Sequence, residues 1–122
     1  MTFNIQNIPS LDWNLSLKLV AGKLKLAKDL FEMMITNLPE EKKLINSAFE
    51  NKDLPKLRDH VHKLHGGCCY TGFSKLKYIC KQLEQEIIFK NHHKITEYIA
   101  FINQEINFLI SNSGSFSEQF MC

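Results

Sequence analysis

The sequence predicts an all-α fold, an antiparallel up-and-down four-helix bundle preceded by a short N-terminal cap helix. Three observations support this prediction. Apolar residues recur at spacings of three and four in successive stretches, as on one face of a helix. Prolines, glycines and polar clusters separate those stretches. No strand-like alternation, internal repeat or low-complexity segment competes with the helical pattern.

The composition is that of one globular domain. The chain has 122 residues and is 44% hydrophobic, which allows a core without disulfides or metals. Its 15 basic and 13 acidic residues are intermixed, so we expect no nucleic-acid partner and no membrane contact. No secretory leader or long apolar run is present, and the four cysteines do not form a secreted disulfide framework. We therefore expect a cytoplasmic chain.

The first half of the chain contains a lead-in, a short helix and a long one. Residues 1–10 are expected to be extended, and Ser10 or Asp12 can cap the short cap helix that follows. A strong amphipathic pattern then covers 23–50, with Pro39 inside it. Because proline removes a backbone donor, we expect either one long bent helix or two nearly collinear ones.

Two further helices are predicted around a tight turn. The first runs over 54–70, and Gly72 is its stop signal. Ser74 can help to cap the next helix, whose apolar residues keep a strict three-four alternation typical of a bundle seam. These seam residues are Phe73, Leu76, Cys80, Leu83 and Ile87.

A final helix over 94–110 completes the predicted bundle. His92 and His93 precede it in a polar break and are interpreted as surface loop residues. The serine-rich segment after the helix is expected to fray into a flexible tail over 113–122. The predicted domain therefore spans 11–112.

The stretch Asp59–Gly72, DHVHKLHGGCCYTG, carries the residues that indicate chemistry. On a helix, its flanking apolar residues form one stripe, and His62 points roughly 130° away from the centre of that stripe, toward water. Gly66 lies one turn further along the same face. A glycine inside a helix costs about 1 kcal/mol relative to alanine, so Gly66 and Gly67 need a reason. That reason is either access to His62 or close packing between helices. The apolar stripe consists of Leu57, Val61, Leu64 and Cys68.

Glu84 is the predicted companion of His62. His62 lies eleven residues before Phe73 and Glu84 lies eleven residues after it. In antiparallel helices joined at that point both lie roughly 16 Å from the turn, and therefore level with each other. A carboxylate that accepts a hydrogen bond from one ring nitrogen leaves the other as a directed nucleophile. The alternative is that Glu84 is a plain surface residue.

Other readings of the histidines stay open. His60 and His65 fall on the shoulders of the apolar stripe and are interpreted as structural residues. His62, His65 and Cys69 share one side of the helix at spacings that suit a Zn²⁺ site, although only three ligands are evident. A module that only binds other proteins and carries out no chemistry is a second alternative. No phosphate-binding glycine loop, nucleotide motif or paired carboxylate site is present.

The motif HKLHG at 62–66 and the motif CYTG at 69–72, followed by Leu76, Cys80 and the pair Leu83-Glu84, resemble the histidine-containing phosphotransfer (HPt) domain. The chain is most similar to the HPt domains of BarA/GacS-type tripartite hybrid sensor histidine kinases. The resemblance covers roughly Leu11 to Ile110.

This resemblance implies a function in a two-component phosphorelay. His62 would take a phosphoryl group from an aspartyl phosphate on the receiver domain of a parent kinase and pass it to a response-regulator aspartate. Glu84 would orient the imidazole. The domain would need no cofactor of its own, because the receiver supplies Mg²⁺. It would have no autonomous kinase activity, act as a monomer in isolation, and lie in the cytoplasm, tethered to the inner membrane where a parent kinase carries it.

One position departs from the wider family. The family usually has lysine three residues after the reactive histidine, and this chain has His65 there. Lys63 is the candidate substitute charge, although it points to a different part of the helix surface. The residues expected to support the site or its docking surface are Lys63, His65, Gly66 and Cys69.

Overall fold

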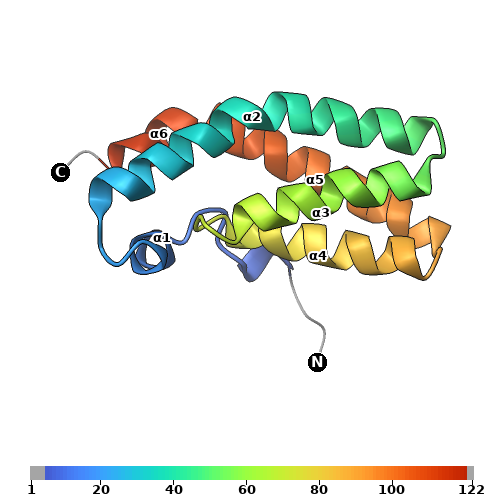
Figure 1. Ribbon diagram of the computed structural model, residues 1–122, viewed down its shortest axis with the longest axis horizontal. Coiled ribbons are helices and arrows are strands. Elements are labelled where there is room, and N and C mark those ends of the chain that lie inside the picture. The colour runs from blue at the N-terminus through green and yellow to red at the C-terminus, as the bar shows by residue number, and fades with distance from the viewer. Residues whose placement is uncertain (1–4, 121–122) are drawn as a thin grey trace.

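The computed structural model describes residues 5–120, and all its regular elements are helices (Figure 1). The four long helices α2 to α5 run antiparallel to one another, and each packs on two neighbours in a closed ring of α2, α3, α4 and α5. The predicted all-α four-helix bundle with an N-terminal cap helix is therefore confirmed. The elements are η1 (Ile5–Asn7), α1 (Trp13–Leu19), α2 (Leu24–Glu50), α3 (Leu54–Cys68), α4 (Ser74–Ile88), α5 (His92–Ser111) and α6 (Ser113–Glu118).

The second helix is continuous across its proline. Of the two predicted arrangements, the structure has the single helix α2 of 27 residues, with Pro39 inside it. Leu38, next to the proline, is completely buried. The loss of one backbone hydrogen bond at Pro39 is thus offset by core packing on both sides of it.

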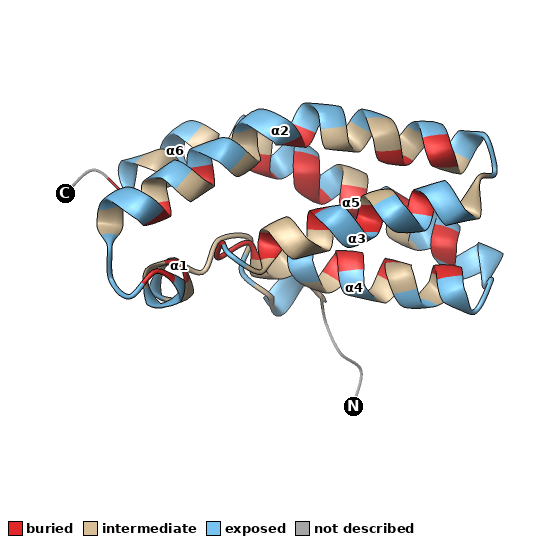
Figure 2. Cartoon of the chain, in the orientation of Figure 1, coloured by how far each residue is buried: buried red, intermediate tan, exposed pale blue. Residues whose placement is uncertain are grey.

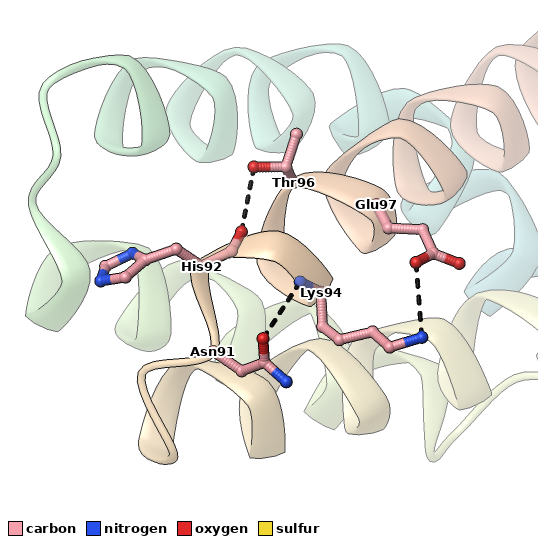
Figure 3. A network of polar contacts seen from close by, with 5 residues as sticks. All are labelled: Asn91, His92, Lys94, Thr96 and Glu97. Carbon is pink, nitrogen blue, oxygen red and sulfur yellow. Dashed lines mark hydrogen bonds and ion pairs between the residues drawn. The ribbon is translucent and has the colours of Figure 1, made fainter.

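Side-chain caps mark the beginning of α3 and α5. Asp53 accepts a hydrogen bond from the Lys56 backbone N–H at 3.1 Å and starts α3. Asn91 does the same for the Lys94 N–H at 3.4 Å and starts α5 (Figure 3). His92, predicted to lie in a loop, is consequently the first residue of α5, where it is exposed and its ring extends away from the helix (Figure 3).

The core lies between the four long helices, on the faces that they turn toward one another (Figure 2). The predicted stripe of α3 is buried, and the seam of α4 is buried against it. Each aliphatic side chain fully removed from water contributes about 1.5–3 kcal/mol. The side chains of this seam are therefore the main force holding α3 and α4 in register. The seam residues of α4 with at most 5% exposure are Leu76, Ile79, Cys80, Leu83 and Ile87.

The cap helix α1 is attached to the turn between α3 and α4. The Asp12 N–H donates a hydrogen bond to the Gly72 carbonyl at 2.7 Å. A Cβ atom on Gly72 would collide with the Asp12 carbonyl and the Ser16 hydroxyl. Glycine is required here because backbone meets backbone.

The segment before α1 differs from the predicted extended lead-in. Ile5–Asn7 form a turn of 3-10 helix, while residues 1–4 of that lead-in lie outside the described residues. The Lys75 N–H donates to the Pro9 carbonyl at 3.1 Å. The Ser10 side chain forms a hydrogen bond with Glu105, a buried carboxyl whose pKa is raised by burial. These contacts fix the segment on the surface formed by α4 and α5.

The prediction of a flexible tail is wrong for most of residues 113–122. Residues 113–118 form α6, and Phe120 is only 3% exposed. Its ring centroid lies 4.7 Å from that of Trp13 and 5.1 Å from that of Phe31. An aromatic side chain buried in this way outweighs the low helix propensity of the serines before it. Residues 121–122 lie outside the described part of the chain.

Removing the Phe120 ring should measure how firmly this end is attached. Phe120→Ala is expected to lower the free energy of unfolding by about 3 kcal/mol, because it leaves a cavity between α1 and α2. Urea denaturation followed by circular dichroism is the measurement. The matched control is Phe89→Ala, since Phe89 is 76% exposed and its loss should change stability by less than about 0.5 kcal/mol. Equal effects of the two substitutions would mean that the last residues are a loose tail after all.

Candidate functional site

His62 lies on the exposed face of α3, and Glu84 reaches it from α4. The His62 side chain is 71% exposed, and its Nδ1 lies 2.9 Å from one Glu84 carboxylate oxygen and 3.2 Å from the other. The packed α3–α4 seam places the two residues level with each other, as the equal distances from the turn predicted. The contact joins two helices and not two turns of one helix.

The contact determines which nitrogen of His62 is nucleophilic. A carboxylate only accepts hydrogen bonds, so Nδ1 carries the proton and donates it to Glu84. The Nε2 lone pair is then left for an incoming electrophile. The Glu84 side chain is 18% exposed and therefore more fixed than the ring that it orients. The pair is a positioned imidazole whose reactive atom is set by a neighbouring helix.

The two adjacent glycines of α3, Gly66 and Gly67, have different surroundings. A Cβ atom on Gly66 would meet no atom within 4 Å, so this position is open on the side of His62. A Cβ atom on Gly67 would lie 2.9 Å from the Met34 sulfur in α2. Both reasons considered for the pair are therefore present, with open space at Gly66 and close helix packing at Gly67.

His65 does not replace the missing lysine as a cation. Its Nε2 is buried and has no hydrogen-bond partner among the described residues. Burial lowers the pKa of His65 from its ordinary value of 6.5, the Lys77 ammonium lowers it further, and the Glu84 carboxylate opposes the shift. His65 is consequently neutral near pH 7 and belongs to the contact between α3 and α4.

Lys63 and Cys69 lie away from the reactive nitrogen. Lys63 is exposed and lines a groove between α2 and α3 together with Met34 and Tyr70. That groove is distinct from the hollow beside His62. Cys69 is half-buried at the C-terminal end of α3, where its N–H donates to the His65 carbonyl at 3.2 Å. Among residues 5–120, no hydrogen bond or ion pair links either side chain to the His62 ring.

The zinc site considered from the sequence has no support in the structure. Among residues 5–120, no three or more His, Cys, Asp or Glu side chains are grouped so that they could hold a metal ion. His62 is engaged with Glu84, and His65 and Cys69 belong to the helix contact and the helix end. The set His62, His65 and Cys69 therefore does not converge on one point.

The hollow beside His62 contains a residue that the sequence analysis did not single out. This space of about 270 Å³ is lined by Pro55, Arg58, Asp59, His62 and Glu84. Arg58 lies four residues before His62, a spacing that places two residues on one helix face and could have identified it.

The site is an exposed imidazole held against a carboxylate of the next helix in an antiparallel bundle. This arrangement is typical of a domain that presents a histidine side chain to partner proteins. The comparisons identify the family. The chain belongs to the Hpt domain family, whose model matches residues 29–107. Phosphorelay in two-component signalling, expected from the sequence, is the function of this family.

Curated relatives and solved structures agree with this assignment. The chain is 37% identical over 78 residues to the signal transduction histidine-protein kinase BarA of Escherichia coli K12, and 35% identical over 74 residues to the sensor protein GacS of Pseudomonas syringae. These matches cover 64% and 61% of the chain but 8% of each relative. The HPt domain of a sensor hybrid histidine kinase from Shewanella is 26% identical, with a TM-score of 0.79 over 90% of this chain and 95% of that one.

A second solved structure has the same fold at lower identity. The histidine-containing phosphotransfer protein HptB of Pseudomonas aeruginosa PAO1 superposes with a TM-score of 0.78 and 19% identity, covering 91% of this chain and 96% of that one.

Between residues 5 and 120, none of the helices has the length and apolar character needed to cross a membrane.

The lowered pKa of His65 should appear in the pH dependence of stability. The folded state disfavours the protonated ring, so below about pH 6.5 the unfolded chain binds this proton more readily. The contribution of His65 to the free energy of unfolding is therefore expected to fall as the pH drops from about 7 to about 5. Glu105, whose pKa is raised by burial, acts in the opposite direction, so the comparison of variants isolates the His65 part. His65→Gln should fall less steeply over that window. His93→Gln is the control because His93 is exposed, and a slope for His65→Gln equal to that of the wild type would contradict the assignment.

The glycine pair allows a matched test of packing. Gly66→Ala should raise the free energy of unfolding by up to about 1 kcal/mol, because it removes a flexible helix residue without a clash. Gly67→Ala should gain less, or lose stability, because Met34 must move away. Thermal and urea unfolding of the two variants give the comparison. Equal gains would show that Met34 does not restrict position 67.

Proposed function

We propose that this chain is a phosphotransfer intermediate in which His62 receives a phosphoryl group from a receiver-domain aspartate and passes it to a response-regulator aspartate. The observation that carries the proposal is the contact of His62 Nδ1 with Glu84 at 2.9 Å on an exposed helix face. It leaves Nε2 as the nucleophile at a surface that a partner protein can cover.

The transfer itself is a substitution at phosphorus. The Nε2 lone pair attacks the phosphorus of an aspartyl phosphate, the P–N bond forms as the P–O bond breaks, and the aspartate carboxylate leaves with the bonding electrons. The Nδ1 proton stays in its hydrogen bond to Glu84, which stabilises the positive charge that develops on the ring. The reverse reaction with another aspartate restores the neutral imidazole and completes the transfer.

The partner provides the rest of the chemistry. Phosphoryl transfer needs charge neutralisation on the equatorial oxygens, usually by Mg²⁺. The described residues contain no cluster of three or more His, Cys, Asp or Glu side chains, and our proposal assigns this ion to the receiver domain. The receiver of a parent hybrid kinase and a separate response regulator are the two partners that such a relay requires.

We infer that the partners dock over α2 and α3 beside His62. A groove of about 290 Å³ runs between these helices, with Leu30, Met33 and Tyr70 among its lining residues. Met33 is 59% exposed and Tyr70 is 69% exposed. Flexible and aromatic side chains at a surface suit contacts with more than one partner. Gly66, which is open beside His62, allows a second backbone to approach the ring.

The test is phosphotransfer from a phosphorylated receiver domain with Mg²⁺. The wild-type chain should acquire acid-labile phosphate, and His62→Gln should acquire none, whereas His60→Gln should remain active. Glu84→Ala should slow labelling roughly tenfold or more, because the ring loses its orienting partner. Gly66→Leu should also slow labelling by blocking the approach.

Two conditions separate this function from its alternatives. ATP and Mg²⁺ without a receiver should leave the chain unlabelled, and EDTA should stop the transfer. Labelling from ATP alone would indicate kinase activity. Tight receiver binding without any labelling of the wild type would identify a docking module that is not phosphorylated.

A further inference from the structure

A phosphoryl group on His62 would bring close to two negative charges to the surface of α3, as phosphorylation of other side chains does. A cation nearby would stabilise it. His65 is neutral near pH 7 because burial lowers its pKa, and Lys63 lines the groove on the other side of the helix. The cation of this site must therefore come from another position, an inference that rests on the proposed function.

Arg58 and His62 border the same hollow. The two residues are four apart on α3 and so share one helix face. A helical side chain leans toward the N-terminus and covers the turn before its own Cα, which for His62 is the turn that contains Arg58. The hollow of about 270 Å³ beside His62 is lined by both residues and by Glu84.

Arg58 is the one Lys or Arg among the residues that line this hollow. The other charged residues that line it are Asp59 and Glu84, and Glu84 is engaged with His62. Within residues 5–120 the Arg58 guanidinium forms no ion pair, and the residue is exposed. Its donors are available. Lys77 and Lys81 of α4 act on His65, one turn further along α3, but neither lines the hollow, so Arg58 is the cation that the hollow itself supplies.

We propose that Arg58 is the phosphoryl-binding residue of this chain. Once Nε2 carries the phosphoryl group, the guanidinium donates hydrogen bonds to two of its non-bridging oxygens. Arginine suits this task because its planar fork of N–H groups matches phosphate geometry and its charge persists at every physiological pH. A hydrogen bond from a cation also favours the dianionic form of the phosphoryl group.

The experiment phosphorylates the full chain with phosphoramidate, a small donor that needs no receiver domain. Arg58→Gln is compared with Arg58→Lys and with Lys56→Gln, which removes the same charge from another face of α3, away from the hollow and the groove. The ³¹P chemical shift of the phosphohistidine, followed against pH, gives the pKa of the phosphoryl group. The equilibrium with a receiver aspartyl phosphate gives the occupancy of His62.

For Arg58→Gln, the phosphoryl pKa should rise and the equilibrium should move about fivefold away from His62, as for an exposed charge pair. Lys56→Gln should leave both quantities unchanged, and Arg58→Lys should fall between Arg58→Gln and the wild type. Thermal unfolding should be the same for all four chains, because both positions are exposed.

The outcomes distinguish this inference from the proposed function. If the wild type takes no phosphate from either donor, the proposed function fails. If the wild type is phosphorylated and Arg58→Gln behaves like Lys56→Gln, the role of Arg58 is overturned and the function stands. Slower transfer from the receiver with an unchanged phosphoryl pKa would also overturn it, by showing that Arg58 binds the partner protein.

Discussion

The packing of α3 against α4 sets the geometry on which the candidate site depends. His62 and Glu84 belong to different helices, so their 2.9 Å contact exists only while the two helices keep their register. A shift of one residue along a helix is about 1.5 Å, enough to break a hydrogen bond. The buried seam between the helices, with Val61 and Leu83 completely covered, resists such a shift. Orientation of an exposed ring is thus achieved by the core beneath it.

The exposed His62 side chain has only one hydrogen-bonding partner, Glu84, in the described part of the chain. The imidazole is open to solvent, and in the proposed function a partner completes the surroundings of the phosphorus atom. The groove between α2 and α3 and the hollow beside His62 differ in character, the first lined by methionines and a tyrosine and the second mainly by charged residues. In the proposal, a partner that covers His62 would contact the groove while the phosphoryl group lies over the hollow.

Much of this could be predicted from the spacing of residues, and the exceptions have physical causes. Helix periodicity located the bundle and the exposed face of His62, and equal distances from a turn located Glu84. The segment that ends in Phe120 escaped prediction because one buried ring anchors it, while the serines around it indicate a loop. The turns after α2 and α4 use Lys52 at φ 56° and Lys90 at φ 55°, residue types that seldom mark a left-handed conformation. The neutral state of His65 depends on burial, which a linear sequence does not display.

Gly66 and Gly67 are adjacent glycines, but different neighbours limit what can replace each of them. The two positions should therefore vary independently among related sequences. Position 67 is limited from inside the protein, by the Met34 sulfur, so a smaller residue at 34 would release it. Position 66 meets no other atom of this chain, so in the proposed function its limit is the partner surface that approaches His62, and no change within the bundle would release it. Variation at 67 should therefore be correlated with variation at 34 in the same chain. Variation at 66 should be correlated with the sequences of other proteins.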